Sequence, residues 1–149
     1  MGKKRRPSAD PALVGEISSR RTPRRAENPN SYLQWTPSWN FSRCDLAHAR
    51  WSLKDSEMFE EIIPKLISFE GRQWSEILQD KKHNHWISCS KLIKEAQDRL
   101  DELHLQYDEL FSLRLTGRLR LFGYIENGIF YIIWHDPDHE ICPSVKKHT

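Results

Sequence analysis

The feature that most constrains the fold is a change of hydrophobic periodicity in the last forty residues, from a helical repeat to strand alternation. Two apolar runs, residues 119–125 and 129–134, flank Asn127 and Gly128. Asn-Gly between apolar runs is a strong signal for a tight β-hairpin, because both residues adopt the positive φ angles that the turn requires. Residues 111–117 alternate in the same way. We therefore predict three consecutive antiparallel strands, the last apolar on both faces and so central in the sheet.

The preceding residues add one strand and helices. Residues 39–46 alternate apolar and polar side chains and predict a first strand. Residues 52–69 have helical spacing that Pro64 kinks or interrupts, and residues 91–105 form the clearest helical pattern. The polar residues 79–85 are expected to form a loop. The fold class is therefore α+β, an antiparallel sheet with helices packed on one face and the first strand beside the sheet in parallel.

Charge divides the chain into two parts. Residues 1–30 contain eight basic and three acidic residues, a net charge of +5, whereas residues 31–149 contain 15 basic and 18 acidic residues, a net charge of −3. The first part has almost no large apolar groups and is predicted to be a disordered basic tail, either a solubilising end or an arm for an acidic partner. Residues 31–149 are predicted to form the single folded domain.

Cysteine usage and hydropathy limit the function classes. The three cysteines are far apart and show neither a disulfide framework nor metal-ligand spacing. No apolar run approaches the roughly 18 residues that a membrane span needs, and no apolar segment follows the basic N-terminus as in a secretory signal. We therefore expect a cytoplasmic protein without a membrane partner or a small-molecule cofactor. His83 and His85, at i and i+2 in a polar segment, are weak evidence for a metal site, and no metal is predicted.

The C-terminal strands carry a family resemblance. The strings LRLTGRLRLFGY (residues 113–124) and GIFYIIW (residues 128–134) resemble the terminal strands of the RelE/ParE superfamily of small bacterial toxins. In that family a leucine-rich strand with a glycine and an arginine leads through a second strand and an Asn-Gly hairpin into an apolar strand and a short basic tail. The resemblance covers about residues 40–149, a RelE/ParE-like toxin domain, and implies a RelE-like fold.

The resemblance also implies a function. RelE-like members cleave mRNA on the ribosome without a metal, and ParE-like members inhibit gyrase. The expected function is thus the toxin component of a type II toxin–antitoxin system, an mRNA endoribonuclease whose partners are a cognate antitoxin, the ribosome and mRNA. The alternative is a non-catalytic protein of the toxin fold that binds gyrase, RNA or an antitoxin. The chain lacks the family's C-terminal catalytic tyrosine, which favours this alternative.

Metal-independent RNA cleavage needs a base, an acid and cations that stabilise the phosphorane. Histidine suits the first two roles because its pKa lies near neutrality, and arginine suits the third because it pairs with phosphate in a bidentate manner. His135, at the end of the last strand, is the candidate acid or base, with Arg118 and Arg120 as catalytic cations. The candidate RNA- or phosphate-binding residues are Arg114, Lys146, Lys147, His148 and, as a stacking platform, Trp134. A solvated polar face is the competing interpretation of the arginines and of His139 and His148.

Overall fold

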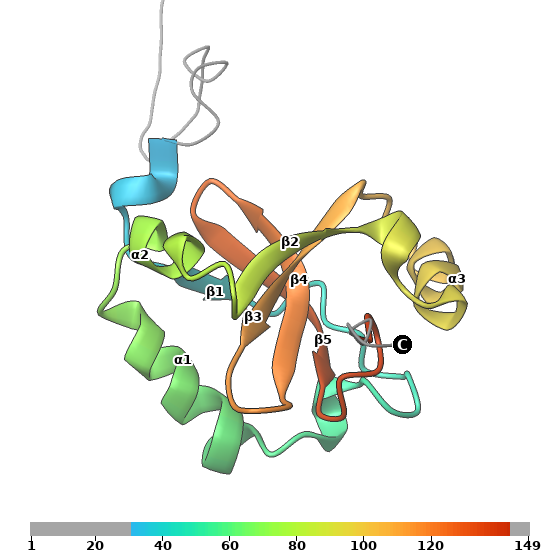
Figure 1. The fold of residues 1–149 in the computed structure, drawn as a ribbon. Coiled ribbons are helices and arrows are strands. Elements are labelled where there is room, and N and C mark those ends of the chain that lie inside the picture. The colour runs from blue at the N-terminus through green and yellow to red at the C-terminus, as the bar shows by residue number, and fades with distance from the viewer. Residues whose placement is uncertain (1–30, 144–149) are drawn as a thin grey trace, which may run out of the picture. The chain divides into compact units, whose positions relative to one another are not determined.

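The computed structural model describes residues 31–143, and the fold is that of the compact unit that begins at Leu33. The predictions for residues 1–30 and for Lys146, Lys147 and His148 therefore lie outside the described residues. This unit contains a five-stranded mixed sheet with the strand order β1-β5-β4-β3-β2 (Figure 1). The strands are β1 (Ser38–Asn40), β2 (Asn84–Ser88), β3 (Glu109–Arg114), β4 (Arg120–Glu126) and β5 (Ile129–Asp136). The expected α+β class is correct.

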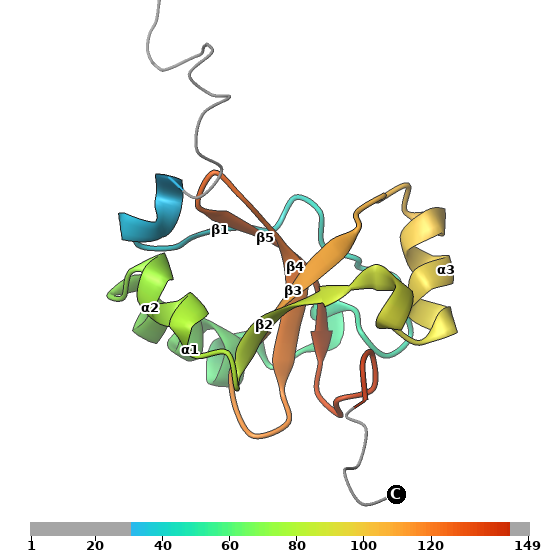
Figure 2. The same ribbon diagram turned by 45° about the horizontal axis from the view of Figure 1, so that its top comes forward.

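Helices lie on both faces of the sheet, which corrects the prediction that they would pack on one face. The helices are α1 (Ile63–Glu70), α2 (Trp74–Gln79) and α3 (Lys94–Glu102), with short helical turns at Ser31–Gln34, Leu53–Asp55, Met58–Ile62 and Cys89–Lys91. Figures 1 and 2 show α1 and α2 on one side of the sheet and α3 on the other. The two apolar faces of the sheet explain this arrangement, because each must be covered.

Strand register defines the two faces. Ser112, Phe122 and Trp134 are opposite one another across β3, β4 and β5, and Phe122 and Trp134 form a buried cluster with Ala96 of α3. Phe111, one position from Ser112, points to the opposite face, where its ring makes an edge-to-face contact with Trp74 of α2 at a centroid distance of 6.1 Å. The helix pair α1–α2 and the helix α3 therefore cover different residues of the same strands.

The predicted hairpin and the parallel pairing of the first strand are both confirmed, but that strand covers only Ser38–Asn40 and not the predicted residues 39–46. Asn127 and Gly128 have φ angles of 54° and 79° and connect β4 to β5. β1 pairs in parallel with β5, with Trp39 opposite Phe130. β5 thus lies between β1 and β4, in agreement with its apolar character on both faces.

Two segments differ from the expectation. Residues 79–85 were expected to be a loop, but β2 begins at Asn84 and forms the sheet edge next to β3. Its polar composition is possible because an edge strand has only one neighbour and part of its surface remains exposed. The expected helix over residues 52–69 is broken into a π-helical turn and α1, with Pro64 in the first turn of α1, where proline is tolerated.

Among residues 31–143, no helix has the length and apolar character needed to cross a membrane.

Candidate functional site

Arg114, a predicted phosphate-binding residue, and Arg120, a predicted catalytic cation, lie side by side. Arg114 on β3 is directly opposite Arg120 on β4, so both side chains leave the same face of the sheet. Both guanidinium groups donate to the backbone carbonyl of Gly117, at 2.9 Å from Arg114 and 3.4 Å from Arg120. Within residues 31–143, neither forms a salt bridge with a carboxylate. Each guanidinium therefore retains donors that can bind an anion, while the carboxylate of Asp136, directly opposite Arg120, offsets part of the charge of Arg120.

His135 does not join these arginines. The register places it opposite Leu121, whereas Arg120 is opposite Asp136, so the side chains of His135 and Arg120 point to opposite faces. His135 is 6% exposed, and its Nδ1 lies 3.2 Å from the carbonyl oxygen of Trp51. The expected cluster of His135 with Arg118 and Arg120 is therefore not formed.

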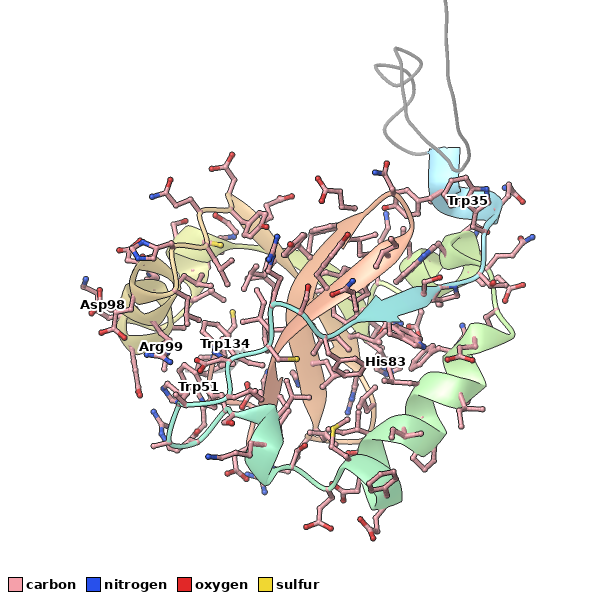
Figure 3. The ribbon with its side chains drawn as sticks, turned by 180° about the vertical axis from the view of Figure 1, so that it is seen from behind. Trp35, Trp51, His83, Asp98, Arg99 and Trp134 are labelled. Atoms are coloured by element: carbon pink, nitrogen blue, oxygen red, sulfur yellow. The ribbon has the colours of Figure 1, made fainter. Side chains whose placement is uncertain are left out.

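Two other predicted residues also lie elsewhere. Arg118 is exposed in the turn before β4, and its guanidinium is 3.7 Å from the carboxylate of Asp138. Trp134 is completely buried, and its Nε1 donates to Asp45 at 2.9 Å. Figure 3 shows Trp134 among the packed side chains near Trp51 and Arg99. The prediction that Trp134 is a stacking platform is wrong, because a ring without exposed surface cannot contact a base.

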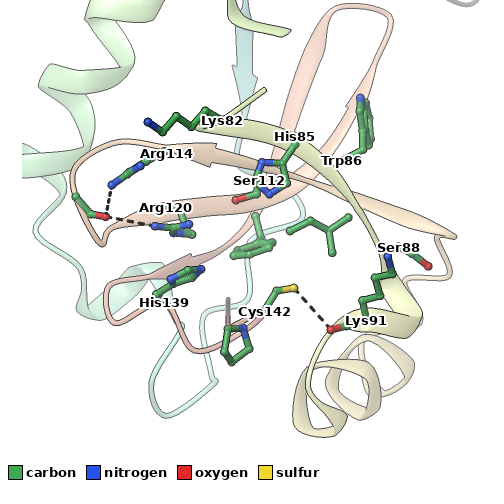
Figure 4. A pocket seen from close by; sticks show the side chains of 14 residues that line it. Lys82, His85, Trp86, Ser88, Lys91, Ser112, Arg114, Arg120, His139 and Cys142 are labelled. Atoms are coloured by element: carbon green, nitrogen blue, oxygen red, sulfur yellow. Dashed lines mark hydrogen bonds between the residues drawn. The ribbon is translucent and has the colours of Figure 1, made fainter. Parts of the chain in front are cut away.

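The cationic pocket, a cavity of 560 Å³, contains Arg114 and Arg120 and opens between β2, β3, β4 and the segment after β5 (Figure 4). It is lined by Lys82, His85, Trp86, Ile87, Ser88, Lys91, Ser112, Arg114, Gly117, Arg120, Phe122, His139, Cys142 and Pro143. These lining residues include four cationic side chains and two imidazoles but no carboxylate. A concave site with charge of one sign concentrates ligands of the opposite charge.

Local structure explains how His85 and His139 enter this pocket. His85 on β2 is directly opposite Ser112 on β3, so its side chain lies on the arginine face. His139 follows β5 in a short segment that we call the clasp, residues 137–143. The buried carboxylate of Asp136 accepts the backbone N–H groups of Glu140 and Ile141, each at 2.9 Å. This anchor holds His139 on the side of Arg120 away from His85 (Figure 4).

Two polar atoms of the pocket are buried without a hydrogen-bond partner: Ser112 Oγ and His85 Nδ1. Ser112 is 1% exposed. A buried polar atom left unpaired costs about 1–3 kcal/mol, so such atoms are rare unless a ligand satisfies them. Because these two residues are neighbours across β2 and β3, they mark one spot on the pocket wall where a hydrogen-bonding ligand would relieve the cost.

The electrostatics of the pocket affect two groups. Burial lowers the pKa of Arg120, and the adjacent charge of Arg114 lowers it further, but arginine remains charged at neutral pH. Burial also lowers the pKa of His139, and the charges of Arg120 and Arg114 act in the same direction. His139 is therefore neutral at pH 7 and able to accept a proton.

Among the described residues, no group of three or more His, Cys, Asp or Glu side chains could hold a metal ion. The side chains of the cationic pocket can bind anions through arginine and lysine and transfer protons through imidazole.

The fold and the pocket define the chain as an α+β protein with a cationic site on its sheet. Residues 31–149 match the model of the family described as "Uncharacterised protein UU032", and the chain belongs to this family. No curated protein and no solved structure matches it significantly.

The sequence indicated only part of this site. Arg114 and Arg120 were candidates because arginine pairs with phosphate and because both lie in the segment that resembles RelE/ParE strands. His85 was assigned to a loop and considered only as a weak metal ligand, and His139 was considered an exposed polar residue. His85 would have been found if residues 84–88 had been recognised as the strand β2. His139 would have been found if Asp136 had been recognised as the residue that anchors the clasp.

Proposed function

We propose that the cationic pocket binds RNA phosphate groups and that the protein is a metal-independent endoribonuclease. The observation that carries this proposal is the combination, in one carboxylate-free pocket, of two guanidinium groups without ion pairs, two imidazoles and a buried unpaired hydroxyl. Guanidinium groups bind phosphate, and a pair of imidazoles provides the base and the acid that the reaction needs.

The reaction assigns one step to each group. Neutral His139 removes the proton from a ribose 2′-hydroxyl, and the 2′-oxygen then attacks the adjacent phosphorus. Arg114 and Arg120 stabilise the additional negative charge of the phosphorane. The bond from phosphorus to the 5′-oxygen breaks while His85 donates a proton to that oxygen. The products are a 2′,3′-cyclic phosphate and a 5′-hydroxyl end, so no water, metal or redox partner is consumed.

The lowered pKa of His139 supports its role as the base, because a neutral imidazole has a free nitrogen lone pair that can accept the proton. Ser112 supports binding, since its buried hydroxyl can donate to a phosphate oxygen.

The proposal extends to the toxin role. Its support is the resemblance of residues 113–134 to RelE/ParE strands, together with the last three antiparallel strands and the parallel first strand; β2 is an additional edge strand that the resemblance did not imply. In this role the ribosome presents the mRNA, and a cognate antitoxin neutralises the protein. Induced expression in bacteria would then stop translation and leave cleaved mRNA, whereas a DNA-damage response would indicate gyrase as the target.

A matched pair of variants tests the pocket directly. Arg114→Gln removes a guanidinium from the pocket, and Arg118→Gln removes one from the exposed turn outside it. We expect Arg114→Gln to lower cleavage of mRNA in a translation extract containing EDTA-treated protein by about 100-fold, because the phosphorane loses a charge-assisted donor. Arg118→Gln should stay within about twofold of the unchanged protein.

The cleaved ends provide a second measurement. A 2′,3′-cyclic phosphate on the upstream fragment agrees with the proposed reaction, and a 3′-hydroxyl contradicts it. RNA that is bound but left intact by the unchanged protein would instead support the non-catalytic alternative. Equal cleavage by the Arg114 and Arg118 variants would exclude the cationic pocket as the reaction site.

A further inference from the structure

The cationic pocket shares lining residues with a neighbouring cavity at each of its ends. At the end near Trp86 it adjoins a cavity of 600 Å³, the aromatic pocket, with which it shares Trp86 and Ser88. At the other end it adjoins a cavity of 280 Å³, the Arg72 pocket, with which it shares Arg114 and Gly117. Figure 4 shows Trp86 and Ser88 at one end of the cationic pocket and Arg114 at the opposite end. The three cavities thus adjoin one another around β2. Because Trp86 packs on Phe111, on the face opposite Ser112, an RNA strand that passes from the cationic pocket to the aromatic pocket crosses the outer edge of β2.

The aromatic pocket suits a nucleobase. Its wall combines Trp86, which is 38% exposed, with Tyr107 and Tyr124. The rings of Trp86 and Phe111 make an edge-to-face contact at a centroid distance of 5.3 Å, which supports Trp86 while part of it remains accessible. The pocket also contains three carboxylates, from Asp108, Glu109 and Glu126. Carboxylates accept hydrogen bonds from base N–H groups and repel phosphate, so this end favours a base.

The Arg72 pocket suits a phosphate. The guanidinium of Arg72 lies over the ring of Phe69 at 5.5 Å and is 3.7 Å from the carboxylate of Glu76, a loose contact between exposed groups. Thr116 contributes a hydroxyl to the same cavity, and Arg114 borders both this cavity and the cationic pocket. The cavity also contains one carboxylate, that of Asp80, which lies 3.0 Å from His83 Nδ1 and also interacts with Arg72. The two guanidinium groups of Arg72 and Arg114 outnumber it, so a second phosphate at Arg72 would follow the first along one strand.

We propose that these cavities are flanking subsites: the aromatic pocket holds a base stacked on Trp86, and the Arg72 pocket holds the phosphate on the other side of the cleaved bond. This inference rests on the proposed function, since it takes the cationic pocket as the central phosphate site. A base that stacks on Trp86 must be free of its own helix, so the substrate is single-stranded over the three cavities.

Binding measurements test the subsites without relying on cleavage. The long probe is an eight-nucleotide 2′-O-methyl RNA, which lacks the attacking hydroxyl, and the short probe is ribose 5-phosphate, which carries one phosphate and no base. The variants are Trp86→Ala and Arg72→Ala. Their matched controls are Trp35→Ala, an exposed tryptophan outside these cavities, and Lys65→Ala, an exposed cation on α1. Circular dichroism establishes that each variant is folded.

We expect Trp86→Ala and Arg72→Ala each to weaken binding of the long probe about tenfold, and more than they weaken binding of the short probe. The two controls should change either affinity by less than about twofold. A duplex of the long probe should bind about tenfold more weakly than the single strand.

The outcomes separate the two proposals. If both probes bind but the duplex binds as tightly as the single strand, the flanking subsites are excluded and the cationic pocket remains supported. The same conclusion follows if both probes bind and the subsite variants behave like the controls. No binding of either probe overturns the proposed function and the subsites together.

Discussion

Ser112 is a residue at which we expect stability and ligand binding to change in opposite directions. Its hydroxyl is buried without a partner, and it lines the cationic pocket. We expect Ser112→Ala to leave the free energy of unfolding unchanged or to raise it by about 1 kcal/mol, because the variant no longer buries an unpaired hydroxyl. The same variant should bind ribose 5-phosphate several-fold more weakly.

Denaturant unfolding and the binding of ribose 5-phosphate measure the two effects. Ser68→Ala serves as a control, because the exposed hydroxyl of Ser68 donates only to the carbonyl of Lys65. A Ser112→Ala protein that is destabilised and binds normally would show that the hydroxyl has a structural role.

Single residues also show how far sequence patterns locate a site. Alternation correctly indicated that Arg120 lies on a strand, and the hairpin register then brought it opposite Arg114. The same reasoning was wrong for His135. The register between β4 and β5 shifts by one position at Phe122 and Gly123, and a shift of one position along a strand moves a side chain to the other face of the sheet. Such a shift depends on packing between strands and leaves no local pattern in the sequence.

At the scale of elements, the predictable parts were those with a strong local rule. The Asn-Gly turn, the three last strands and the helix that became α3 follow from turn chemistry and periodicity. β2 was missed because it is short, polar and at the sheet edge, so pairing with β3 rather than its own composition determines it. Since β2 supplies His85 and Trp86, this omission also hid half of the candidate site.

Gly123 makes a prediction about β4 and β5. A Cβ at this position would lie 2.0 Å from the carbonyl oxygen of Tyr131 and 2.9 Å from the ring of Phe130, so the backbone of one strand would have to move. We expect Gly123→Ala to lower the free energy of unfolding by about 3 kcal/mol. In Gly71→Ala the added Cβ has no atom within 4 Å, and its stability should change by less than about 1 kcal/mol. Equal stability of the two variants in urea would contradict this explanation of the β4–β5 approach.

At the scale of the whole unit, Asp45 connects segments that are far apart in the sequence. Its buried carboxylate accepts two hydrogen bonds from Arg99 of α3, both at 2.8 Å, and one from Trp134 of β5 at 2.9 Å. Burial alone would raise the pKa of Asp45, but these bonds and those from the N–H groups of Ala47 and His48 outweigh it and lower the pKa. The charged form is therefore the one that stabilises the fold.

This network predicts how stability depends on pH. A carboxyl with a lowered pKa in the folded state contributes stability that is complete above its unfolded pKa, near 3.9, and is lost as the pH falls below that value. Asp45→Asn removes this contribution and should lower the free energy of unfolding at pH 7 by about 3 kcal/mol. Urea unfolding from pH 7 to pH 2 should therefore show a steeper loss for the unchanged protein than for Asp45→Asn. Parallel curves would show that Asp45 is not the titrating group.

The clasp has a consequence for how this family can diversify. The five paired strands are complete at Asp136, and only the few residues after it bring His139, Cys142 and Pro143 to the cavity wall. A family member with the same five strands but different residues after β5 would keep the sheet and have different side chains in the cationic pocket. We therefore expect family members to preserve their strand framework while exchanging chemistry through this short terminal stretch.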